Sequence, residues 1–312
     1  MLSRRTLLAA GLALPALRPA AAQGATRVSL LHLNDFHSRH EGAQANGAAC
    51  RADQPCLGGS ARLVGAVKAA RAAAAGEGRG VLALDGGDQF MGSLFYTVHR
   101  GLAEAAIQQA WGVQAMALGN HEFDHGPENA ARYIRALGAP VLAANLDTTD
   151  EPALHGLVRP FTVFQHGGAR IAVIGLITEE TPTIASPGPR LRFRNSEEAA
   201  ERAIAEARAA GPATVVLLSH RGLAADQRLA QRIRGVDVIV GGHSHTILAN
   251  IPGAAGPHPV VVDGPDRAVR IVQAGALGRF VGRLDLDLAP DGRVTAHGGE
   301  AAEVAPALAE DA

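Results

Sequence analysis

Residues 115–122 read AMALGNHE and join an apolar run to a polar turn. Short apolar runs bounded by glycine are typical of strands in the interior of a sheet. Gly119 lets the backbone turn sharply after the run, and Asn120 and His121 follow immediately. Four other segments repeat this arrangement of a predicted strand followed by possible metal ligands. We therefore expect a sheet whose strand ends meet at one functional site.

The rest of the chain alternates between two kinds of segment. Apolar runs of strand length occupy 28–33, 81–84, 115–118, 141–144, 171–177, 215–218 and 236–240. Amphipathic spacing typical of helices occupies 61–75, 101–111, 128–137, 197–210 and 224–233. Such alternation predicts an α/β architecture with layered sheets. Shorter strand-like pieces at 260–263, 269–274 and 282–288 are expected to complete a second sheet by antiparallel pairing.

The composition is that of a globular protein without a strong charge bias. The chain has 312 residues, of which 47% are hydrophobic, and a net charge of -1. A chain of this size can bury a large core. Binding to nucleic acid or to an anionic membrane depends on clustered positive charge, which this sequence lacks. We therefore expect no nucleic-acid partner, and a phosphate substrate must be held by a local site.

Residues 1–22 have the features of an export signal. SRRTLL at 3–8 is a twin-arginine pattern, an apolar stretch covers 7–17, and three alanines at 20–22 suit cleavage. We therefore expect twin-arginine export to the periplasm, or secretion, and a mature chain that starts near Gln23. The apolar stretch is too short to span a bilayer and contains Pro15, so we expect no stable membrane anchor.

Two cysteines, Cys50 and Cys56, lie close together in a segment rich in glycine, alanine and glutamine. An exported protein reaches an oxidising compartment, where disulfides form and persist. We therefore expect these two cysteines to form a disulfide bond. Two free thiols are the alternative, and alkylation of the unreduced protein would distinguish the two states.

The polar segments after the predicted strands are Asn34-Asp35-Phe36-His37, Gly86-Gly87-Asp88, Gly119-Asn120-His121-Glu122, Ser219-His220 and Gly241-Gly242-His243-Ser244-His245. Asp35 and His37 are two residues apart, so in an extended segment their side chains point to the same face. His243 and His245 repeat that spacing. A lone buried histidine is usually a hydrogen-bonded core residue, but five such segments at strand ends favour a metal site.

The types of ligand indicate the kind of metal site. Carboxylate, imidazole and amide groups suit Zn²⁺, Mn²⁺ or iron at a hydrolytic site, whereas thiolates are typical of structural zinc. The candidate ligands outnumber those that one ion needs. We therefore expect two divalent ions that share Asp88, because two close ions stabilise both the attacking and the leaving oxygen in a displacement at phosphorus.

In their order, these motifs resemble those of the calcineurin-like metallophosphoesterase superfamily. The segments LHLNDFHSR, CLGGSARL, DGGDQF, MALGNHEFDHG, GVDVIVGGHSHT and IVQAGALGRFVG are similar to the N-terminal domain of 5'-nucleotidases. This resemblance implies a layered α/β/β/α sandwich, with a catalytic domain expected at 23–300. Residues 301–312 are expected to start a linker to a second, nucleoside-binding domain that this chain does not include.

The resemblance also implies a role for each candidate residue. One ion is expected to be held by Asp35, His37, Asp88 and His245, and the other by Asp88, Asn120, His220 and His243. His121 and Asp124 match the family's catalytic dyad, in which the histidine stabilises the transferring phosphoryl group and the carboxylate orients its ring. The alternative role for Asp124 is to cap a helix that begins near Pro127.

The predicted function is an exported, dinuclear-metal phosphohydrolase of 5'-nucleotidase type. It would release phosphate from nucleoside 5'-monophosphates or related esters through attack by a metal-activated water. The alternatives are a thiosulfohydrolase of sulfur oxidation, which the motifs resemble less closely, and an inactive metal-binding remnant without its substrate-binding domain. Four aromatic residues near the motifs are interpreted as packing residues and not as a platform for the base: Phe90, Phe95, Tyr96 and Phe123.

Overall fold

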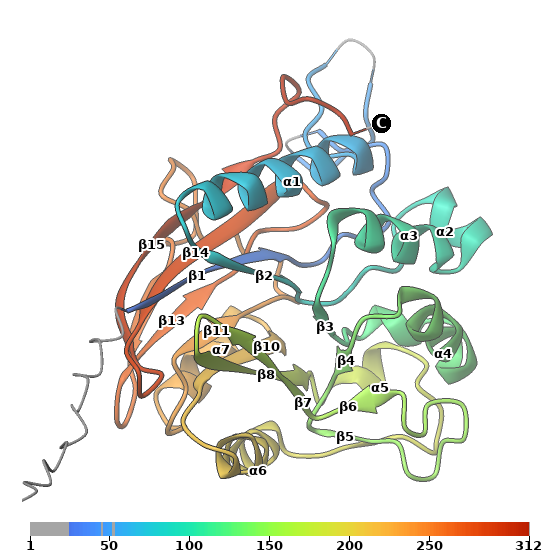
Figure 1. The fold of residues 1–312 in the computed structure, drawn as a ribbon. Helices are drawn as coiled ribbons and strands as arrows, with labels where there is room; N and C mark the ends of the chain where they lie inside the picture. The colour runs from blue at the N-terminus through green and yellow to red at the C-terminus, as the bar shows by residue number, and fades with distance from the viewer. Residues whose placement is uncertain (1–24, 45, 52–53, 312) are drawn as a thin grey trace, which may run out of the picture.

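The structure is a computed structural model, and it describes residues 25–311 apart from 45, 52 and 53. The predicted export signal at 1–22 lies outside the described residues. Two sheets pack face to face, and helices cover the outer face of each sheet (Figure 1). This arrangement confirms the predicted α/β/β/α sandwich. Within the described residues, no helix is both long enough and apolar enough to cross a membrane.

Parallel pairing dominates the middle of both sheets. Among the described residues, the strand order of the first sheet is β15 (Val294–Glu303), β14 (Phe280–Leu288), β1 (Thr26–Leu33), β2 (Gly80–Asp85), β3 (Ala115–Ala117), β4 (Val141–Leu142), β6 (Val158–Arg159). The order in the second sheet is β12 (Val260–Asp263), β13 (Ala268–Val272), β11 (Val238–Val240), β10 (Thr214–His220), β8 (Ala169–Ile177), β7 (Phe161–His166). A separate antiparallel pair joins β5 (Leu146–Asp147) to β9 (Arg192–Phe193).

Helices form the two outer layers. The first sheet is covered by α1 (Ser60–Gly76), α3 (Leu102–Trp111) and α4 (Gly126–Leu137), and the second by α6 (Ser196–Ala209) and α7 (Leu223–Ala230). Short helices in the connections are α2 (Leu94–His99), η1 (His121–Phe123) and α5 (Thr181–Ile184). α6 shows why the sequence is helical there: Asn195 caps it by accepting the N–H of Glu198, and alanines at 199, 203 and 207 form its buried face.

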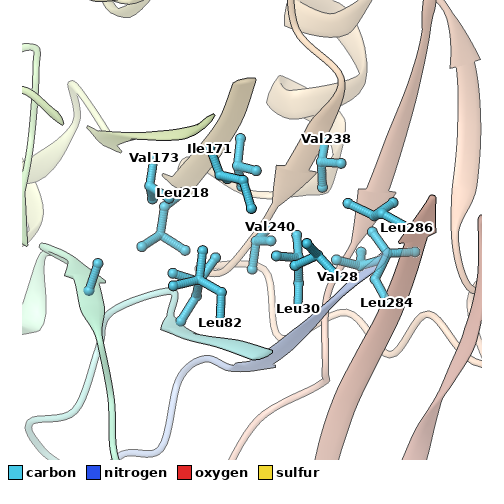
Figure 2. Packing of buried hydrophobic residues seen from close by; sticks show 14 of the residues in the cluster. Val28, Leu30, Leu82, Ile171, Val173, Leu218, Val238, Val240, Leu284 and Leu286 are labelled. Carbon is cyan, nitrogen blue, oxygen red and sulfur yellow. The ribbon is translucent and has the colours of Figure 1, made fainter. Parts of the chain in front are cut away.

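Alternate residues of β1 lie in two different cores, one between the two sheets and one between the first sheet and its helices. Val28 and Leu30 of β1 point between the sheets, where they share a buried cluster with Val240 of β11 and lie beside Leu284 and Leu286 of β14 (Figure 2). Leu31 and Leu33 point the other way and pack with α1. Each buried aliphatic side chain of this kind contributes roughly 1.5–3 kcal/mol. Because both faces of β1 are buried, its apolar residues do not alternate with exposed polar ones, and even Ser29 and His32 within the strand are buried.

The C-terminal strands differ from the prediction. The strands at 260–263 and 269–274 join the second sheet, but β13 is parallel to β11, and only β12 pairs antiparallel with β13. The predicted strand at 282–288 was assigned to the wrong sheet, because β14 pairs antiparallel with β1 in the first sheet. β14 covers what would otherwise be an open edge of β1 and adds Leu284 and Leu286 to the core between the sheets.

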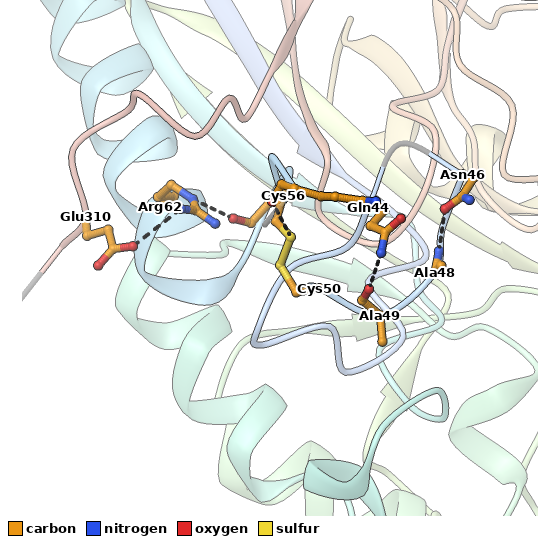
Figure 3. The surroundings of a disulfide bond; sticks show 10 residues. Gln44, Asn46, Ala48, Ala49, Cys50, Cys56, Arg62 and Glu310 are labelled. Atoms are coloured by element: carbon orange, nitrogen blue, oxygen red, sulfur yellow. Dashed lines mark hydrogen bonds and ion pairs between the residues drawn. A yellow bond between two sulfur atoms is a disulfide. The ribbon is translucent and has the colours of Figure 1, made fainter. Parts of the chain in front are cut away.

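The predicted disulfide between Cys50 and Cys56 is confirmed (Figure 3). The two Cα atoms are 5.7 Å apart. At the base of this loop, the backbones of Ala43 and Leu57 exchange two hydrogen bonds, with N···O distances of 2.9 and 2.8 Å. The loop follows His37 along the chain, so the disulfide and this bridge stabilise a segment next to a candidate ligand.

Candidate metal centre

Candidate ligands from both sheets meet at one place. Those of the first sheet follow β1, β2 and β3, and those of the second sheet end β10 or follow β11. Ligand atoms lie within 4.8 Å of one another in three groups: Asp35 with His37 and His245, His37 with Asp88 and His121, and Asp88 with His220 and His243. His37 and Asp88 each belong to two groups, so the groups form one continuous site.

The first group combines one carboxylate with two imidazoles. His37 Nε2 lies 2.9 Å from His245 Nε2, and Asp35 Oδ1 lies 3.3 Å from the same His245 nitrogen. The other ring nitrogen of His37, Nδ1, lies 3.0 Å from the carbonyl oxygen of Phe90. If Nδ1 donates its hydrogen to that carbonyl, Nε2 keeps a lone pair that points into the site, as in metal-bound histidines.

The group of Asp88, His220 and His243 also has a histidine whose Nδ1 lies beside a backbone carbonyl oxygen. His220 Nδ1 lies 2.7 Å from the carbonyl oxygen of Gly86, and His220 Nε2 lies 3.0 Å from Asp88 Oδ2. Asp88 Oδ2 is also 4.0 Å from His37 Nε2, so Asp88 lies between the two groups, where a shared ligand is expected. Gly119 is required beside it, because a Cβ at that position would lie 2.1 Å from Asp88 Oδ1.

His121 and Asp124 form a pair at the edge of the site. His121 Nδ1 lies 2.7 Å from Asp124 Oδ2, and the His121 ring packs edge-on against His37. The hydrogen bond to Asp124 raises the pKa of His121 to about 9, with a further contribution from Asp88 and against the effect of burial. α4 begins without a side-chain cap, so Asp124 contacts His121 and does not cap that helix.

The donor atoms fit divalent metal ions. Asn120 Oδ1 is buried and has no hydrogen-bond partner among the described residues, which costs about 1–3 kcal/mol unless something binds there. His220 Nε2 is also buried and, within the part of the chain that the structure describes, lies 3.0 Å from Asp88 Oδ2 without a further hydrogen-bond partner. Carboxylates, an amide oxygen and imidazoles together suit borderline ions such as Zn²⁺ or Mn²⁺. The predicted ligand set is thus chemically consistent with such ions.

Five candidate ligands have backbone angles in the left-handed region. Their φ angles are 52° at Asp35, 49° at His37, 58° at Asp88, 72° at His243 and 52° at His245. Residues other than glycine rarely adopt this region, and each instance costs on the order of 1–3 kcal/mol. Strain of this kind concentrates at functional sites, where the surrounding structure holds it. The loops that carry the ligands therefore need strong supports.

Burial and Asp88 set the charges of the candidate ligands. Burial lowers the pKa of His37 and of His243, which keeps them neutral, as metal binding requires. At His220, burial also opposes the charge, but the Asp88 carboxylate raises the pKa to about 10. Burial opposes the charge on Asp88 as well, and His220 and His37 outweigh it, so the pKa of Asp88 is lowered. Asp88 therefore stays ionised at the centre of the site.

Two carboxylates to which the sequence analysis gave no role support the loop of Asp88. Glu122 accepts hydrogen bonds from the backbone N–H groups of Asp88, Gln89 and Gly119 at 3.1, 2.8 and 2.7 Å. Asp85 accepts from the side-chain amide of Gln89 at 2.9 and 3.1 Å. Both residues lie within the quoted motifs DGGDQF and MALGNHEFDHG, which is the signal that could have drawn attention to them.

Gln273 supports the loop that carries the two histidines after β11, and it was missed too. Its Nε2 donates to the carbonyl oxygen of Gly242 at 2.6 Å, and its Oε1 accepts the backbone N–H of Thr246 at 2.6 Å. The side chain is buried directly after β13. Gln273 thus joins a strand of the second sheet to the segment between these two contacts, in which His243 and His245 lie.

The aromatic residues near the motifs lie mainly in the core. Phe90, Tyr96 and Phe123 are buried in the cluster between the first sheet and its helices. Phe95 is partly exposed and packs against His40, with ring centroids 4.8 Å apart. The positions of Phe90, Tyr96 and Phe123 agree with the interpretation of these residues as packing residues, whereas Phe95 is exposed.

The sequence and the fold of the chain are similar to those of known phosphoesterases. A model for calcineurin-like phosphoesterases matches residues 28–246. The 5'-nucleotidase of Rattus norvegicus is 35% identical over 294 residues, which cover 91% of this chain and 50% of that protein. The crystal structure of a 5'-nucleotidase precursor from Thermus thermophilus has a TM-score of 0.85 and 39% identity, covering 91% of this chain and 56% of that one. The chain therefore spans about half the length of these relatives.

A sulfate thiohydrolase of Thermus thermophilus has a TM-score of 0.75 at 23% identity and covers 94% of this chain and 59% of its own. At that identity the similarity concerns the fold alone. The expected resemblance to 5'-nucleotidases is confirmed by the closer matches. The family model spans more than half of the sequence and includes all five ligand segments, so this chain belongs to the calcineurin-like phosphoesterase family.

Proposed function

We propose that this chain provides the catalytic domain of an exported phosphoric ester hydrolase that uses two divalent ions to release phosphate from nucleoside 5'-monophosphates. The observation that supports this most strongly is the convergence of three ligand groups that share His37 and Asp88. Such an arrangement suits two ions close together, as in many hydrolases of phosphate esters. The 5'-nucleotidase relatives support a nucleotide as the substrate.

Each residue of the dyad has a distinct task in this proposal. Divalent ions would supply a nucleophile from water and would stabilise charge on the phosphoryl oxygens. Because His121 Nδ1 is hydrogen-bonded to Asp124, the protonated ring can donate its Nε2–H to an oxygen of the transferring phosphoryl group. Asp124 fixes the orientation of the ring and helps it keep the proton.

The cellular location is part of the proposal. The disulfide between Cys50 and Cys56 supports an oxidising compartment such as the periplasm. We propose twin-arginine export directed by the signal at 1–22 and a catalytic domain at 23–300. If the signal acts in this way, replacing Arg4 and Arg5 by lysine will retain the protein in the cytoplasm. Cell fractionation measures this, and normal arrival of the variant in the periplasm would contradict it.

Asp88→Ala is the direct test of the chemistry. Phosphate release from AMP is measured with Mn²⁺ or Zn²⁺, with and without a chelator. We expect the variant to lose about a thousandfold in rate, since Asp88 stands between both ligand groups. Asp263→Ala is the matched control, because Asp263 is exposed at the end of β12. Equal rates for the Asp88 variant and the wild type would refute the assignment.

The same assay separates the two alternatives. A metal-binding remnant would bind Zn²⁺ but release no phosphate from AMP or from an aryl phosphate. A thiosulfohydrolase would instead release sulfate from an S-sulfonated cysteine. The fold similarity to a sulfate thiohydrolase at 23% identity does not favour that second activity over the first.

A further inference from the structure

Glu104, in the first turn of α3, is a fully buried carboxylate outside the candidate ligand set. A buried carboxylate is costly unless hydrogen bonds compensate for the lost water. Glu104 Oε1 accepts the hydroxyl hydrogen of Ser38 and lies 3.2 Å from His40 Nε2. Burial opposes the charge of Glu104, but the hydrogen bonds from His40 and Ser38 outweigh it and lower its pKa. The buried charge is thus stabilised by two residues that follow the candidate ligand His37 in the chain.

Ser38 connects Glu104 to His37. It is buried, and both it and the preceding His37 have φ angles in the left-handed region, 55° and 49°. Residues other than glycine rarely adopt this region, so the surroundings must hold the pair in place. Ser38 Oγ is fixed from two sides, because it accepts the hydroxyl of Ser93 at 2.9 Å and donates to Glu104.

The loop of His37 is supported on two sides, and only one support depends on Glu104. On the first side, the backbone N–H groups of His37 and Ser38 donate to the carbonyl oxygens of Asp88 and Gln89 at 3.2 and 3.0 Å. On the second side, the only hydrogen-bonding partners of the Glu104 carboxylate among the described residues are Ser38 and His40. Glu104 therefore acts on this ligand loop and on none of the others.

His40 extends the second support to α1. Its Nδ1 lies 2.7 Å from Ser60 Oγ, and the backbone N–H of Ser60 donates to the carbonyl oxygen of His40 at 2.9 Å. The ring also packs edge-on against Phe36, with ring centroids 5.1 Å apart. Glu104 is therefore held rigidly where the loop of His37 meets α1 and α3.

We infer that Glu104 is a positioning residue for one of the two proposed ions and that it acts through Ser38. The inference rests on the proposed two-ion site. The first ion has His37 among its expected ligands: Asp35, His37, Asp88 and His245. The second ion has no expected ligand in this loop: Asp88, Asn120, His220 and His243. Without Glu104, Ser38 and then His37 can leave the left-handed conformation, so the first ion loses a ligand and the second keeps its full set.

Calorimetric titration of the metal-free protein with Zn²⁺ tests this selectivity. We expect the wild type to bind two equivalents. In Glu104→Ala, the affinity for one equivalent should fall by about 100-fold, and the affinity for the other should stay within about threefold. Glu104→Gln keeps an oxygen that can accept the hydroxyl of Ser38, so its loss should be less than about tenfold. A general structural defect would weaken both equivalents together.

The double variant Ser38→Ala, Glu104→Ala tests whether the effect passes through Ser38. Ser38→Ala alone should weaken the same equivalent by about tenfold. If Glu104 acts through Ser38, the double variant binds no more weakly than Glu104→Ala, whereas independent effects multiply. The matched control is Glu198→Ala, because Glu198 is also in the first turn of a helix but is exposed. This control should bind both equivalents as the wild type does.

Four results would overturn the inference. Glu104→Ala could bind both equivalents as the wild type does, or weaken both equally. Glu104→Gln could be as weak as Glu104→Ala, or the losses in the double variant could multiply. A wild type that binds only one equivalent would instead contradict the two-ion proposal, and the inference would then hold only if Glu104→Ala weakens that ion and Glu104→Gln does not. Two bound ions without hydrolysis of AMP would count against the nucleotide function alone, because the titration does not depend on turnover.

Discussion

The two sheets contribute different chemistry to the same site. The loops of the first sheet carry candidate carboxylate and amide ligands as well as His37, whereas the candidate ligands of the second sheet are all imidazoles. Their supports differ in the same way: the Glu122 carboxylate holds the Asp88 loop, and the Gln273 amide holds the loop after β11. Hydrogen bonds to a charged group are roughly twice as strong as neutral ones, but a buried carboxylate responds to pH. The first sheet should therefore hold its ligands more firmly and be more sensitive to pH.

Glu122→Ala is expected to have the largest effect. The change removes the acceptor of three buried backbone N–H groups, each of which costs about 1–3 kcal/mol when unsatisfied. We expect the free energy of unfolding to fall by on the order of 5 kcal/mol. Zn²⁺ affinity should fall by about 100-fold, because residues that orient a ligand strongly affect metal binding. Urea denaturation of the metal-free protein and calorimetric titration with Zn²⁺ measure the two quantities.

The control for this variant is Glu201→Ala, which changes an exposed glutamate on α6. It should leave both quantities close to those of the wild type. If Glu122→Ala behaved like this control, the carboxylate would not be the support of the Asp88 loop, and the contrast between the sheets would disappear.

Asp85→Asn tests the sensitivity to pH. Burial raises the pKa of Asp85 to about 7, against hydrogen bonds from Gly87, Gln108 and Gln89, and the nearby charge of Asp35 adds to the rise. Because this pKa lies above the ordinary value of 3.8, the stability that Asp85 contributes is complete below about pH 4 and is lost as the pH rises toward 7. Asparagine cannot ionise, so the variant should escape this loss.

The stability of the Asp85→Asn variant relative to the wild type should therefore increase between pH 4 and pH 8. A pKa difference of about 3 corresponds to at most about 4 kcal/mol. Urea denaturation of the metal-free proteins at several pH values measures the difference, with Asp263→Asn as the exposed control. If the free energy of unfolding of Asp85→Asn changed with pH in the same way as that of the wild type, Asp85 would not make the first sheet sensitive to pH.

The interior of the fold was predictable from the sequence, and its edges were not. β1 and β10 are buried on both faces, so apolar residues dominate both strands without regular alternation, as is typical of interior strands. β7 lies at the edge of the second sheet with mostly half-buried residues, and its sequence gives no comparable signal. The alternating residues of β14 predict a strand, but its pairing with β1 joins segments more than 200 residues apart, which spacing alone cannot reveal.

The candidate ligands were predictable, but the residues that support them were not. Asp35 and His243 lie two and three residues after the ends of β1 and β11, in segments where several possible metal ligands follow predicted strands. Glu122 and Gln273 form hydrogen bonds with backbone groups of the ligand loops. Any polar side chain near a strand end could form such bonds, so the sequence does not identify these two residues. Only the folded geometry shows that Gln273 contacts Gly242, 31 positions earlier in the chain.

Gln273→Ala should have the smallest of the three effects and completes the comparison. The change leaves the carbonyl oxygen of Gly242, the N–H of Thr246 and the hydroxyl of Ser244 without their partner, and all three bonds are neutral. Neutral hydrogen bonds contribute about 0.5–1.5 kcal/mol each, so we expect a loss of about 2 kcal/mol in the free energy of unfolding. Because His243 and His245 both lie in this loop at strained backbone angles, Zn²⁺ affinity should fall by about tenfold.

The matched control is Gln231→Ala, at the exposed end of α7. The comparison of the two sheets depends on how much Zn²⁺ affinity Gln273→Ala loses relative to Glu122→Ala. Both variants truncate a support to alanine and each removes three hydrogen bonds, so their difference tests the effect of the charge of the support. A loss of Zn²⁺ affinity for Gln273→Ala as large as that for Glu122→Ala would mean that backbone strain at the histidines, and not the charge of the support, determines how firmly each sheet holds its ligands.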